Sequence, residues 1–376
     1  MRCKLENICL KITDGSHYSP ADDPTSCIPM LSVKDMEEFD FNYNNCKHIS
    51  EDEFNKLLKN DCVPKENDVL VAKDGSYLKE IFVNENENKK AILSSIAIFR
   101  PNQNKVDPYF LCYLLKTPMI LNYVKDNCVS GSALPRIILR AFKGIELTIP
   151  KINIQKRIVK IIKNINDKIK INNEISNNLY EISKQLLLKY LDENSSSEEI
   201  NISELLNVFT GKKNANETSP TGKYKFFSCA PESLLSNTYL YDGAAIIVAG
   251  NGAYTGRTRF YDGKFELYQR TYGLTLKDGF DKNNIYGLYV FMKTIFEPDK
   301  MGGTHGSAIP YIVLSDLTDY KLKYNKEEFD KFSNLVSGNI KMIQENEKSN
   351  EELSQLRDTL LPKLMNGEID LENIEI

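Results

Sequence analysis

The stretch from residue 151 to residue 191 constrains this chain most, because it contains neither proline nor glycine. Apolar residues recur in it at alternating steps of three and four, the heptad spacing of a helix that packs along one face. At about 1.5 Å per residue, a helix over Ile154–Leu191 is about 55 Å long and cannot bury its apolar stripe alone. The stripe consists of Ile158, Ile161, Ile165, Ile175, Leu179, Ile182 and Leu186, with Lys168 and Asn172 at its central positions.

A second long helix is predicted near the end of the chain. Asn325 followed by Glu328 is typical of a helix N-cap with a capping box, and Gly367 suits the position just after a helix C-terminus. We expect the two helices to form an antiparallel coiled coil in which the polar central zones meet. The alternative is that each helix packs only on its own globular neighbour. The second stripe comprises Phe332, Leu335, Met342, Leu353, Leu356 and Leu360, with Asn339, Asn346 and Ser349 at its centre.

The chain contains an internal repeat. Gly131–Arg140 reads GSALPRIILR and returns 175 residues later as Gly306–Ser315, GSAIPYIVLS. Ala72–Gly75 likewise matches Ala249–Gly252 at nearly the same offset. Matched blocks in the same order at nearly one offset indicate two copies of one unit, a globular part followed by a long helix.

Each copy mixes short apolar strands with helices, so we predict an α+β fold with two similar globular domains. The first copy has strand patterns at 68–71, 78–83 and 92–99 and a helix after Asp107-Pro108; the second has them at 244–248, 258–261 and 272–276 and a helix at 283–294. The predicted domains are 1–150, the first helix at 151–193, a second globular domain at 194–325, and the second helix with its tail at 326–376.

Composition excludes several functional classes. The 376 residues carry a net charge of −4, so any basic DNA-binding surface must be local. The eight cysteines form no Cys-x-x-Cys, which favours reduced thiols over a zinc cluster. The N-terminus has no signal-peptide core and no apolar run is long enough to cross a membrane, so we expect a cytoplasmic protein.

Catalytic motifs are missing from the sequence. There is no Walker A loop, no His-Glu-x-x-His, no Gly-x-Ser-x-Gly and no Asn/Asp-Pro-Pro-Tyr of an amino-methyltransferase. Gly250–Gly256 superficially resembles a dinucleotide loop, but the alternating residues after it predict a strand where that motif needs a helix. We therefore predict that the chain is not an enzyme and binds no metal or cofactor.

Hydrogen-bonding and cationic side chains collect on the glycine-rich turns of both copies. Arginine can bind guanine, and asparagine or glutamine can bind adenine, through two hydrogen bonds each. For each residue alone the alternative is an ordinary surface group. The candidate DNA-binding residues are Lys73, Ser76, Tyr77, Ser132 and Arg136 in the first copy, and Asn251, Tyr254, Arg257, Arg259, Gln269, Arg270, Thr304, His305, Ser307 and Tyr311 in the second.

Over essentially its whole length the chain resembles the specificity subunit of type I restriction–modification enzymes. The resemblance is carried by Gly131-Ser132, Leu147–Pro150, Gln155–Ile158 and the helix ending Leu356–Ile369. The second junction departs from the family pattern, because residues 322–333 lack both the Ile-Pro and the Gln-Lys pairs.

The resemblance implies a non-catalytic subunit in which each globular domain reads one half of a bipartite site on double-stranded DNA. The helix pair would set the gap between the halves. Two modification subunits, which bind S-adenosylmethionine and methylate adenine, would dock on the helices, and motor-nuclease subunits would join them for restriction. The residues expected to contact these partners are Gln155, Arg157, Leu356 and Leu360.

Two other functions are compatible with the sequence. One is a DNA-binding protein of the same architecture with other partners, and the other is a coiled-coil scaffold whose loops bind protein. Retention on DNA at low salt with a steep loss as salt rises separates a DNA binder from a scaffold.

Overall fold

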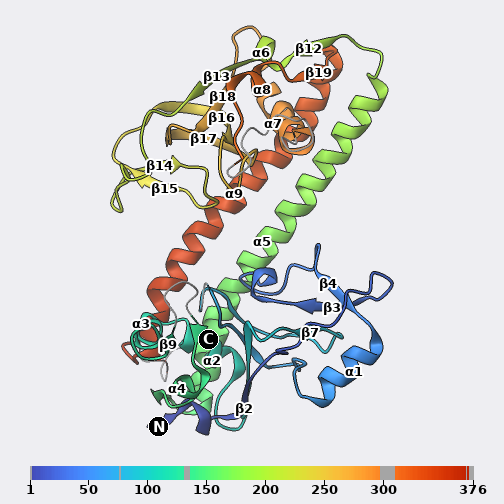
Figure 1. Cartoon of the computed structure of the whole chain (residues 1–376). Coiled ribbons are helices and arrows are strands. Elements are labelled where there is room, and N and C mark those ends of the chain that lie inside the picture. The colour runs from blue at the N-terminus through green and yellow to red at the C-terminus, as the bar shows by residue number, and fades with distance from the viewer. Residues whose placement is uncertain (1, 76–77, 131–135, 297–309, 370, 372–376) are drawn as a thin grey trace. The chain divides into compact units, whose positions relative to one another are not determined.

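The computed structural model describes residues 2–75, 78–130, 136–296, 310–369 and 371. The chain divides into two compact units, which we call unit 1 (residues 1–170 and 350–376) and unit 2 (residues 171–349). The two long helices are α5 (Ile152–Glu193) and α9 (Lys326–Met365), and each gives part of its length to each unit (Figure 1).

Unit 1 contains, besides its parts of α5 and α9, short strands and helices that precede α5. In chain order they are β1 (Arg2–Lys4), η1 (Leu5–Asn7), β2 (Cys9–Asp14), β3 (Ile28–Leu31), η2 (Val33–Asp35), β4 (Lys47–Ile49), α1 (Glu51–Lys59), β5 (Val69–Ala72), β6 (Ile81–Val83), β7 (Ala91–Ile92), β8 (Ile96–Pro101), α2 (Pro108–Leu115), α3 (Pro118–Asn127), β9 (Val129–Ser130), β10 (Arg136–Ile137), α4 (Leu139–Lys143) and β11 (Glu146–Thr148).

The central sheet of unit 1 has the strand order β2-β8-β5-β6, and its neighbouring strands are antiparallel. Both faces of β5 are buried, which explains its uninterrupted apolar sequence. Val69 and Val71 belong to the core that contains α2, whereas Leu70 and Ala72 belong to a second core on the other face. A smaller sheet, β4-β3-β7, packs with Phe54 and Leu57 of α1 in a core of its own.

The described residues of unit 2 form a six-stranded sheet and three short or medium helices besides the unit's parts of α5 and α9. The elements are β12 (Glu199–Asn201), α6 (Ile202–Leu205), β13 (Leu206–Thr210), β14 (Tyr224–Phe227), β15 (Leu234–Ser236), β16 (Tyr241–Ala249), β17 (Thr258–Leu267), β18 (Thr271–Leu276), α7 (Asn284–Ile295), α8 (Leu314–Thr318) and β19 (Lys321–Lys323).

The sheets of the two units share one topology. Unit 2 has the order β13-β18-β16-β17-β14-β15, so its first four strands repeat the order β2-β8-β5-β6 of unit 1. Each unit also has a two-stranded pair next to its long helix, β1-β11 in unit 1 and β12-β19 in unit 2. The internal duplication and the α+β class predicted from sequence are confirmed.

Strand β16 separates two cores of unit 2. Ile246 and Val248 face the core that contains α7, while Ala245 and Ile247 face a smaller core with Phe265. The sheet curls back at the end of β13, where Gly211 lies against the backbone of the β17–β18 turn. A Cβ atom at Gly211 would lie 2.1 Å from the carbonyl oxygen of Leu267, so glycine is required for this approach.

Each unit buries its own section of both long helices. In unit 1, Ile158 and Ile162 of α5 share the main core with Leu361 and Leu364 of α9. In unit 2, the Tyr190 ring of α5 stacks on Phe332 of α9 with ring centroids 5.5 Å apart. The helices therefore pack both on each other and on the globular parts. The predicted helix pair and its alternative, packing on the globular neighbour, occur together.

Polar contacts give the direction of the helix pair. In unit 2, Asn346 Nδ2 donates to the carbonyl oxygen of Asn172 at 3.3 Å and to Ser176 Oγ at 3.1 Å, and Asn339 Nδ2 donates to Ser183 Oγ at 3.1 Å. Partner numbers on α9 fall as those on α5 rise, so the pair is antiparallel. The prediction that polar central residues meet is confirmed for Asn172 and Asn346.

The predicted apolar stripes were wrong over much of their length. Leu335, Met342, Ile175 and Ile182 are exposed, and the buried residues of α5 from Val159 onwards lie mostly one position later than predicted. The physical reason is that each helix also covers a globular core, which turns its buried face away from a simple two-helix seam. The buried face of α9 in unit 2 is formed by Phe329, Phe332, Ser333, Val336, Ile340 and Ile343.

The ends of α9 follow the sequence prediction. Asn325 Oδ1 accepts a hydrogen bond from the Glu328 backbone N–H at 3.3 Å, as an N-cap does. At the other end Gly367 has φ = +72°, and the Glu368 N–H donates to the Lys363 carbonyl at 2.9 Å. Together these features make a Schellman cap that glycine adopts without strain.

Gly211→Ala should lower the free energy of unfolding by about 1–3 kcal/mol, because the new methyl group must displace the β17–β18 backbone. Gly338→Ala is the matched control: no atom lies within 4 Å of the added Cβ, and alanine in a helix interior should stabilise by about 0.5–1 kcal/mol. Thermal and urea unfolding measure both. A Gly211→Ala protein as stable as the wild type would show that the contact relaxes freely.

Candidate nucleic-acid interface

In both units the central strand ends in a tight polar turn. Strand β5 runs into Lys73-Asp74-Gly75, and β16 runs into Gly250-Asn251-Gly252. The glycines have φ values of +69° and +86°, which an L side chain rarely adopts. The turn after the central strand thus has the same left-handed glycine in both copies.

The same backbone contacts hold each turn. Asp74 forms an isolated β-bridge with Arg136, and Asn251 forms one with Tyr311. The Ile137 N–H donates to the Lys73 carbonyl at 3.0 Å, and the Ile312 N–H donates to the Gly250 carbonyl at 3.0 Å. We call this arrangement the turn clamp: residues 73–75 with 136–137 in unit 1, and residues 250–252 with 311–312 in unit 2.

The turn clamp of unit 1 carries two ion pairs. Arg136 Nε lies 3.2 Å from Asp74 Oδ1, and Lys73 Nζ lies 2.8 Å from Asp14 Oδ2 at the end of β2. His17 Nε2 is 3.5 Å from the same Asp14 oxygen. Lys73 is only 5% exposed, so its ammonium group fixes the turn to β2. The DNA contact predicted for Lys73 stays a prediction.

The turn clamp of unit 2 presents uncharged and cationic groups. Arg257 lies over the ring of the exposed Tyr254, with its Cζ 4.0 Å from the ring centroid. Gln269 and Arg270 are exposed on the β17–β18 turn, where Gln269 Nε2 donates to Asn214 Oδ1 at 3.0 Å. An open hollow of about 300 Å³ lies between these turns, lined by Gly250, Gln269, Arg270, Tyr272 and Ile312.

Arg259 has a structural position. Its guanidinium donates to the carbonyl oxygens of Ser228 at 2.7 Å, Ala230 at 2.9 Å and Pro231 at 3.0 Å. Burial, and to a lesser degree the nearby Arg257, lowers the pKa of Arg259. These donors hold the turn after β14. The DNA contact predicted for Arg259 stays a prediction.

Sequence reasoning missed residues that are distant along the chain but close to the clamps. Asp14 and His17 join the clamp of unit 1, and Cys229 joins that of unit 2, where its Sγ donates to Asn251 Oδ1 at 3.1 Å. No local pattern connects these residues to their partners. Ser76, Tyr77, Ser132, Thr304, His305 and Ser307, which were predicted to bind DNA, lie outside the described residues.

Gln155 was predicted to contact a partner protein, but its side chain is fully buried. Its Oε1 accepts from the Asp107 N–H at 2.9 Å, and its Nε2 donates to the carbonyls of Lys105 at 3.1 Å and Pro150 at 2.9 Å. This amide fastens the start of α5 to the loop before α2, and the partner contact predicted for Gln155 stays a prediction. Among the other residues predicted to contact partners, Leu356 is exposed and Leu360 packs partly on the core of unit 1, while Arg157 is half-buried.

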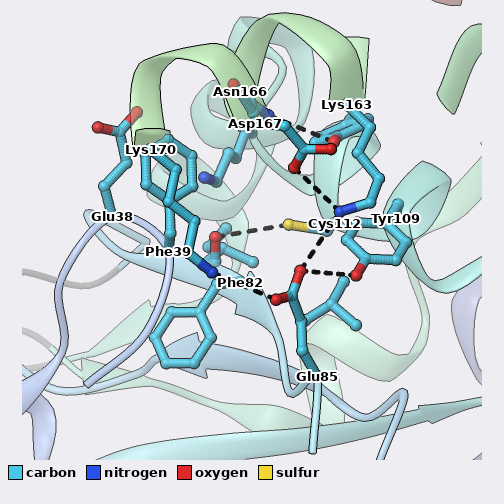
Figure 2. Close-up of a pocket in the computed structure, with 14 residues that line it drawn as sticks. Glu38, Phe39, Phe82, Glu85, Tyr109, Cys112, Lys163, Asn166, Asp167 and Lys170 are labelled. Atoms are coloured by element: carbon cyan, nitrogen blue, oxygen red, sulfur yellow. Dashed lines mark hydrogen bonds and ion pairs between the residues drawn. The ribbon is translucent and has the colours of Figure 1, made fainter. Parts of the chain in front are cut away.

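A polar seam joins α5 to the globular part of unit 1 (Figure 2). Glu85 accepts from the Tyr109 hydroxyl at 2.8 Å and lies 3.4 Å from both Lys163 Nζ and Lys170 Nζ. Burial alone would raise the pKa of Glu85, but the Tyr109 hydrogen bond and the two lysines outweigh it and lower that pKa. The seam surrounds a space of only about 40 Å³, so it is a docking contact and not a ligand pocket.

A second set of hydrogen bonds ties α9 into unit 1. Arg357 Nη1 donates to Glu38 Oε1 at 2.7 Å and to Asn166 Oδ1 at 3.2 Å, and Asn166 in turn donates to the Tyr113 hydroxyl at 3.3 Å. The C-terminal helix is thereby bonded to α5, to α2 and to the loop at Glu38. This section of α9 is an integral part of unit 1.

The described residues bear on two further kinds of feature, metal-binding clusters and membrane-spanning helices. Within them, no cluster of three or more His, Cys, Asp or Glu side chains is arranged to hold a metal ion. In the same part of the chain, no helix combines the length and apolarity needed to cross a membrane. The arrangement of both clamps is suited to polar recognition.

Comparison with known proteins gives consistent matches. The family model described as type I restriction modification DNA specificity domain matches residues 19–181 and 194–353, which fall on the two copies. The MjaVIII specificity subunit of Methanocaldococcus jannaschii is 23% identical over 395 residues, 92% of this chain and 90% of that subunit. The EcoDI specificity subunit of Escherichia coli is 29% identical over 181 residues, 46% of this chain and 38% of that subunit.

A solved structure shares the fold. The crystal structure of the S subunit of a type I restriction-modification system from M. genitalium matches 97% of this chain and 95% of its own, with a TM-score of 0.60 and 16% identity. At this identity the likeness concerns the fold alone.

Arg259→Ala should lower the free energy of unfolding by about 1.5–3 kcal/mol, since three carbonyl groups lose a charged donor. Arg270→Ala removes the same charge from an exposed side chain and should change stability by less than about 0.5 kcal/mol. Urea unfolding monitored by tyrosine fluorescence compares the two proteins. Equal stability of both variants would refute the structural role of Arg259.

Proposed function

This chain belongs to the type I restriction modification DNA specificity family, and we propose on that basis that it selects the DNA sequence for a modification complex. In this proposal each unit reads one half of a bipartite site on double-stranded DNA. The chain itself performs no chemistry, and partner subunits that bind S-adenosylmethionine transfer the methyl group to adenine.

The duplicated turn clamp carries this proposal. The two clamps have the same bridge, the same carbonyl–amide hydrogen bond and the same left-handed glycine. Their side chains differ, with Asp74 and Arg136 in unit 1 where unit 2 has Asn251 and Tyr311. A common backbone frame with different side chains is what two domains need to read two different half-sites.

The side chains around the clamp of unit 2 suit base edges in the major groove. Asn251 and Gln269 can bind the N6 and N7 edge of adenine, and Arg270 can bind O6 and N7 of guanine. Arg257 lies over Tyr254 in a cation–π contact, which restrains a long side chain. These four polar residues come from two turns that flank one hollow, so one short DNA segment can meet them together.

The long helices suit protein partners. On α9, Leu335 is 65%, Met342 49% and Leu356 48% exposed, at steps of seven and fourteen residues that place them on one side of that helix. A row of exposed apolar side chains on a helix is typical of a protein interaction surface. We propose that modification subunits cover this row and that Leu356 is one of their contacts.

The test is co-purification followed by a methylation assay. The tagged chain expressed in its native cells should bring down a DNA adenine methyltransferase, and only the complex should transfer labelled methyl groups from S-adenosylmethionine to DNA. Robust methyl transfer by the chain with no partner detectable by mass spectrometry would contradict the non-catalytic role. Tight pull-down of proteins without any retention on DNA would favour a scaffold.

The same complex allows a site-specific control. Arg270→Ala should weaken recognition by about 1–3 kcal/mol at one position of one half-site if Arg270 binds a base, or weaken binding to all sequences alike if it binds phosphate. An affinity and a site preference both equal to those of the wild type would show that the clamp hollow of unit 2 does not face DNA.

We further propose that the helices set the gap between the half-sites. Seven residues inserted into each helix, next to Asn172 and next to Asn346, preserve the heptad and lengthen each helix by about 10 Å. At about 3.4 Å per base pair, the gap should widen by about three base pairs while both half-sites stay the same. Sequencing of methylated sites measures both properties.

The outcomes of that experiment are distinct. An unchanged gap with full methylation would mean that the helices do not determine the spacing. A changed half-site would mean that the helices themselves read bases. A single insertion in α5 alone is the mismatched control, and it should abolish pairing of Asn172 with Asn346 and reduce assembly.

A further inference from the structure

We propose that Arg136 and Asp74 of unit 1 read together one G·C base pair of the half-site, with Arg136 on guanine and Asp74 on the paired cytosine. The inference rests on the proposed function and specifies which base pair unit 1 selects. It arises from the one place where an exposed arginine and a carboxylate are held side by side on a turn clamp.

The pair is fixed in two ways. The backbones of the two residues form a β-bridge, and the side chains form an ion pair in which Arg136 Nε lies 3.2 Å from Asp74 Oδ1. The Arg136 side chain is 64% exposed and the Asp74 side chain 21%. Arginine has five N–H donors, so contact through Nε leaves the terminal amino groups available to a ligand.

The surroundings hold the pair rigid. Lys73, between β5 and Asp74, donates its N–H to the Ser95 carbonyl at 2.9 Å and accepts from the Ile137 N–H at 3.0 Å. Its ammonium group is bound to Asp14 at 2.8 Å and is buried. The turn is therefore fastened to β2, to the residue before β8 and to β10, and a preorganised group loses little entropy on binding.

The carboxylate of Asp74 indicates that Arg136 binds a base and not a phosphate. An arginine that serves only phosphate gains from being unpaired, because its contribution to binding comes from charge and released counterions. Here Asp74 neutralises Arg136 and is itself repelled by phosphates. A carboxylate is useful at a DNA surface where it can accept a hydrogen bond, and cytosine N4 provides that donor in the major groove.

The chemistry of the base pair matches the chemistry of the protein pair. Guanine presents two acceptors, O6 and N7, that fit the terminal amino groups of one guanidinium. Cytosine presents the N4 amino group, which fits Oδ2 of Asp74, because Oδ1 is buried beside Arg136 Nε. An A·T pair offers a donor where Arg136 needs an acceptor, so the same arrangement discriminates against it.

Unit 2 supplies an internal contrast. Its equivalent residues are Asn251 and Tyr311, joined by the same bridge but without charge. The carboxylate–arginine pair is thus a property of unit 1 alone and not of the shared backbone frame. Its effect should be confined to one half-site.

The experiment uses the chain assembled with its co-purifying modification subunits and a random library of double-stranded DNA, with methylated sites read by sequencing. Arg136→Ala should reduce the preference for G·C at one position of one half-site by about ten- to a hundredfold and leave the other half-site unchanged. Arg136→Lys keeps the charge but loses the planar fork, and it should lose most of the same preference. Asp74→Asn should weaken the preference at that same position only.

Arg140→Ala is the matched control, because it removes an equal charge from an exposed position on α4. It should leave the sequence preference as in the wild type. Retention of the modification subunits and an unchanged melting temperature show that each variant is folded. The inference is overturned if the folded Arg136→Ala complex keeps its G·C preference or loses affinity for all sequences alike. A wild-type complex without any sequence preference would instead overturn the proposed function.

Discussion

The packing of each long helix against two surfaces at once is the constraint on which the rest of this structure depends. Tyr190 of α5 stacks on Phe332 of α9 while both belong to the main core of unit 2. In unit 1, Gln155 and Glu85 bond α5 to the loop before α2 and to the strand segment after β6. A helix held on two sides cannot rotate, so each globular part has a fixed orientation on its own section of helix.

In each unit, the section of the long helices packs with a globular part whose sheet has a central strand that ends in the turn clamp. Strand β5 and the last five residues of β16 are buried on both faces, so the ends of these strands are determined by the cores and not by the loops. The clamp then repeats the same bridge at Asp74–Arg136 and Asn251–Tyr311. Rigid strands that present variable side chains at their ends separate stability from recognition, which lets the two copies diverge in what they read.

Sequence reasoning reached the local features and failed where partners are distant. The duplication, the strand at β5 and the cap at Asn325 follow from local patterns and were predicted. The helix faces could not be predicted, because the choice of Ile162 over Ile161 as the buried residue depends on a core assembled from other parts of the chain. The ion pair of Lys73 could not be predicted for the same reason, since its partner Asp14 lies 59 residues away. The strands β3 and β4 were not predicted because β3 contains Pro29 and β4 has only one apolar residue, so neither has the sequence pattern of a strand.

The distribution of charged side chains explains how a chain with a net charge of −4 can have a DNA-reading surface. Some of its cationic side chains form ion pairs within the fold. Arg100 binds the fully buried Asp68 at 2.8 Å, and Lys73 binds Asp14. Such pairs stabilise the turns but contribute little long-range attraction to DNA. The Arg136–Asp74 pair goes one step further, because it is neutral as a whole and yet partly exposed. A neutral pair adds little to affinity for phosphates, whereas its fixed donors and acceptor distinguish one base pair from another. A subunit built in this way contributes sequence information, and the attraction that brings DNA to it can come from the rest of the complex.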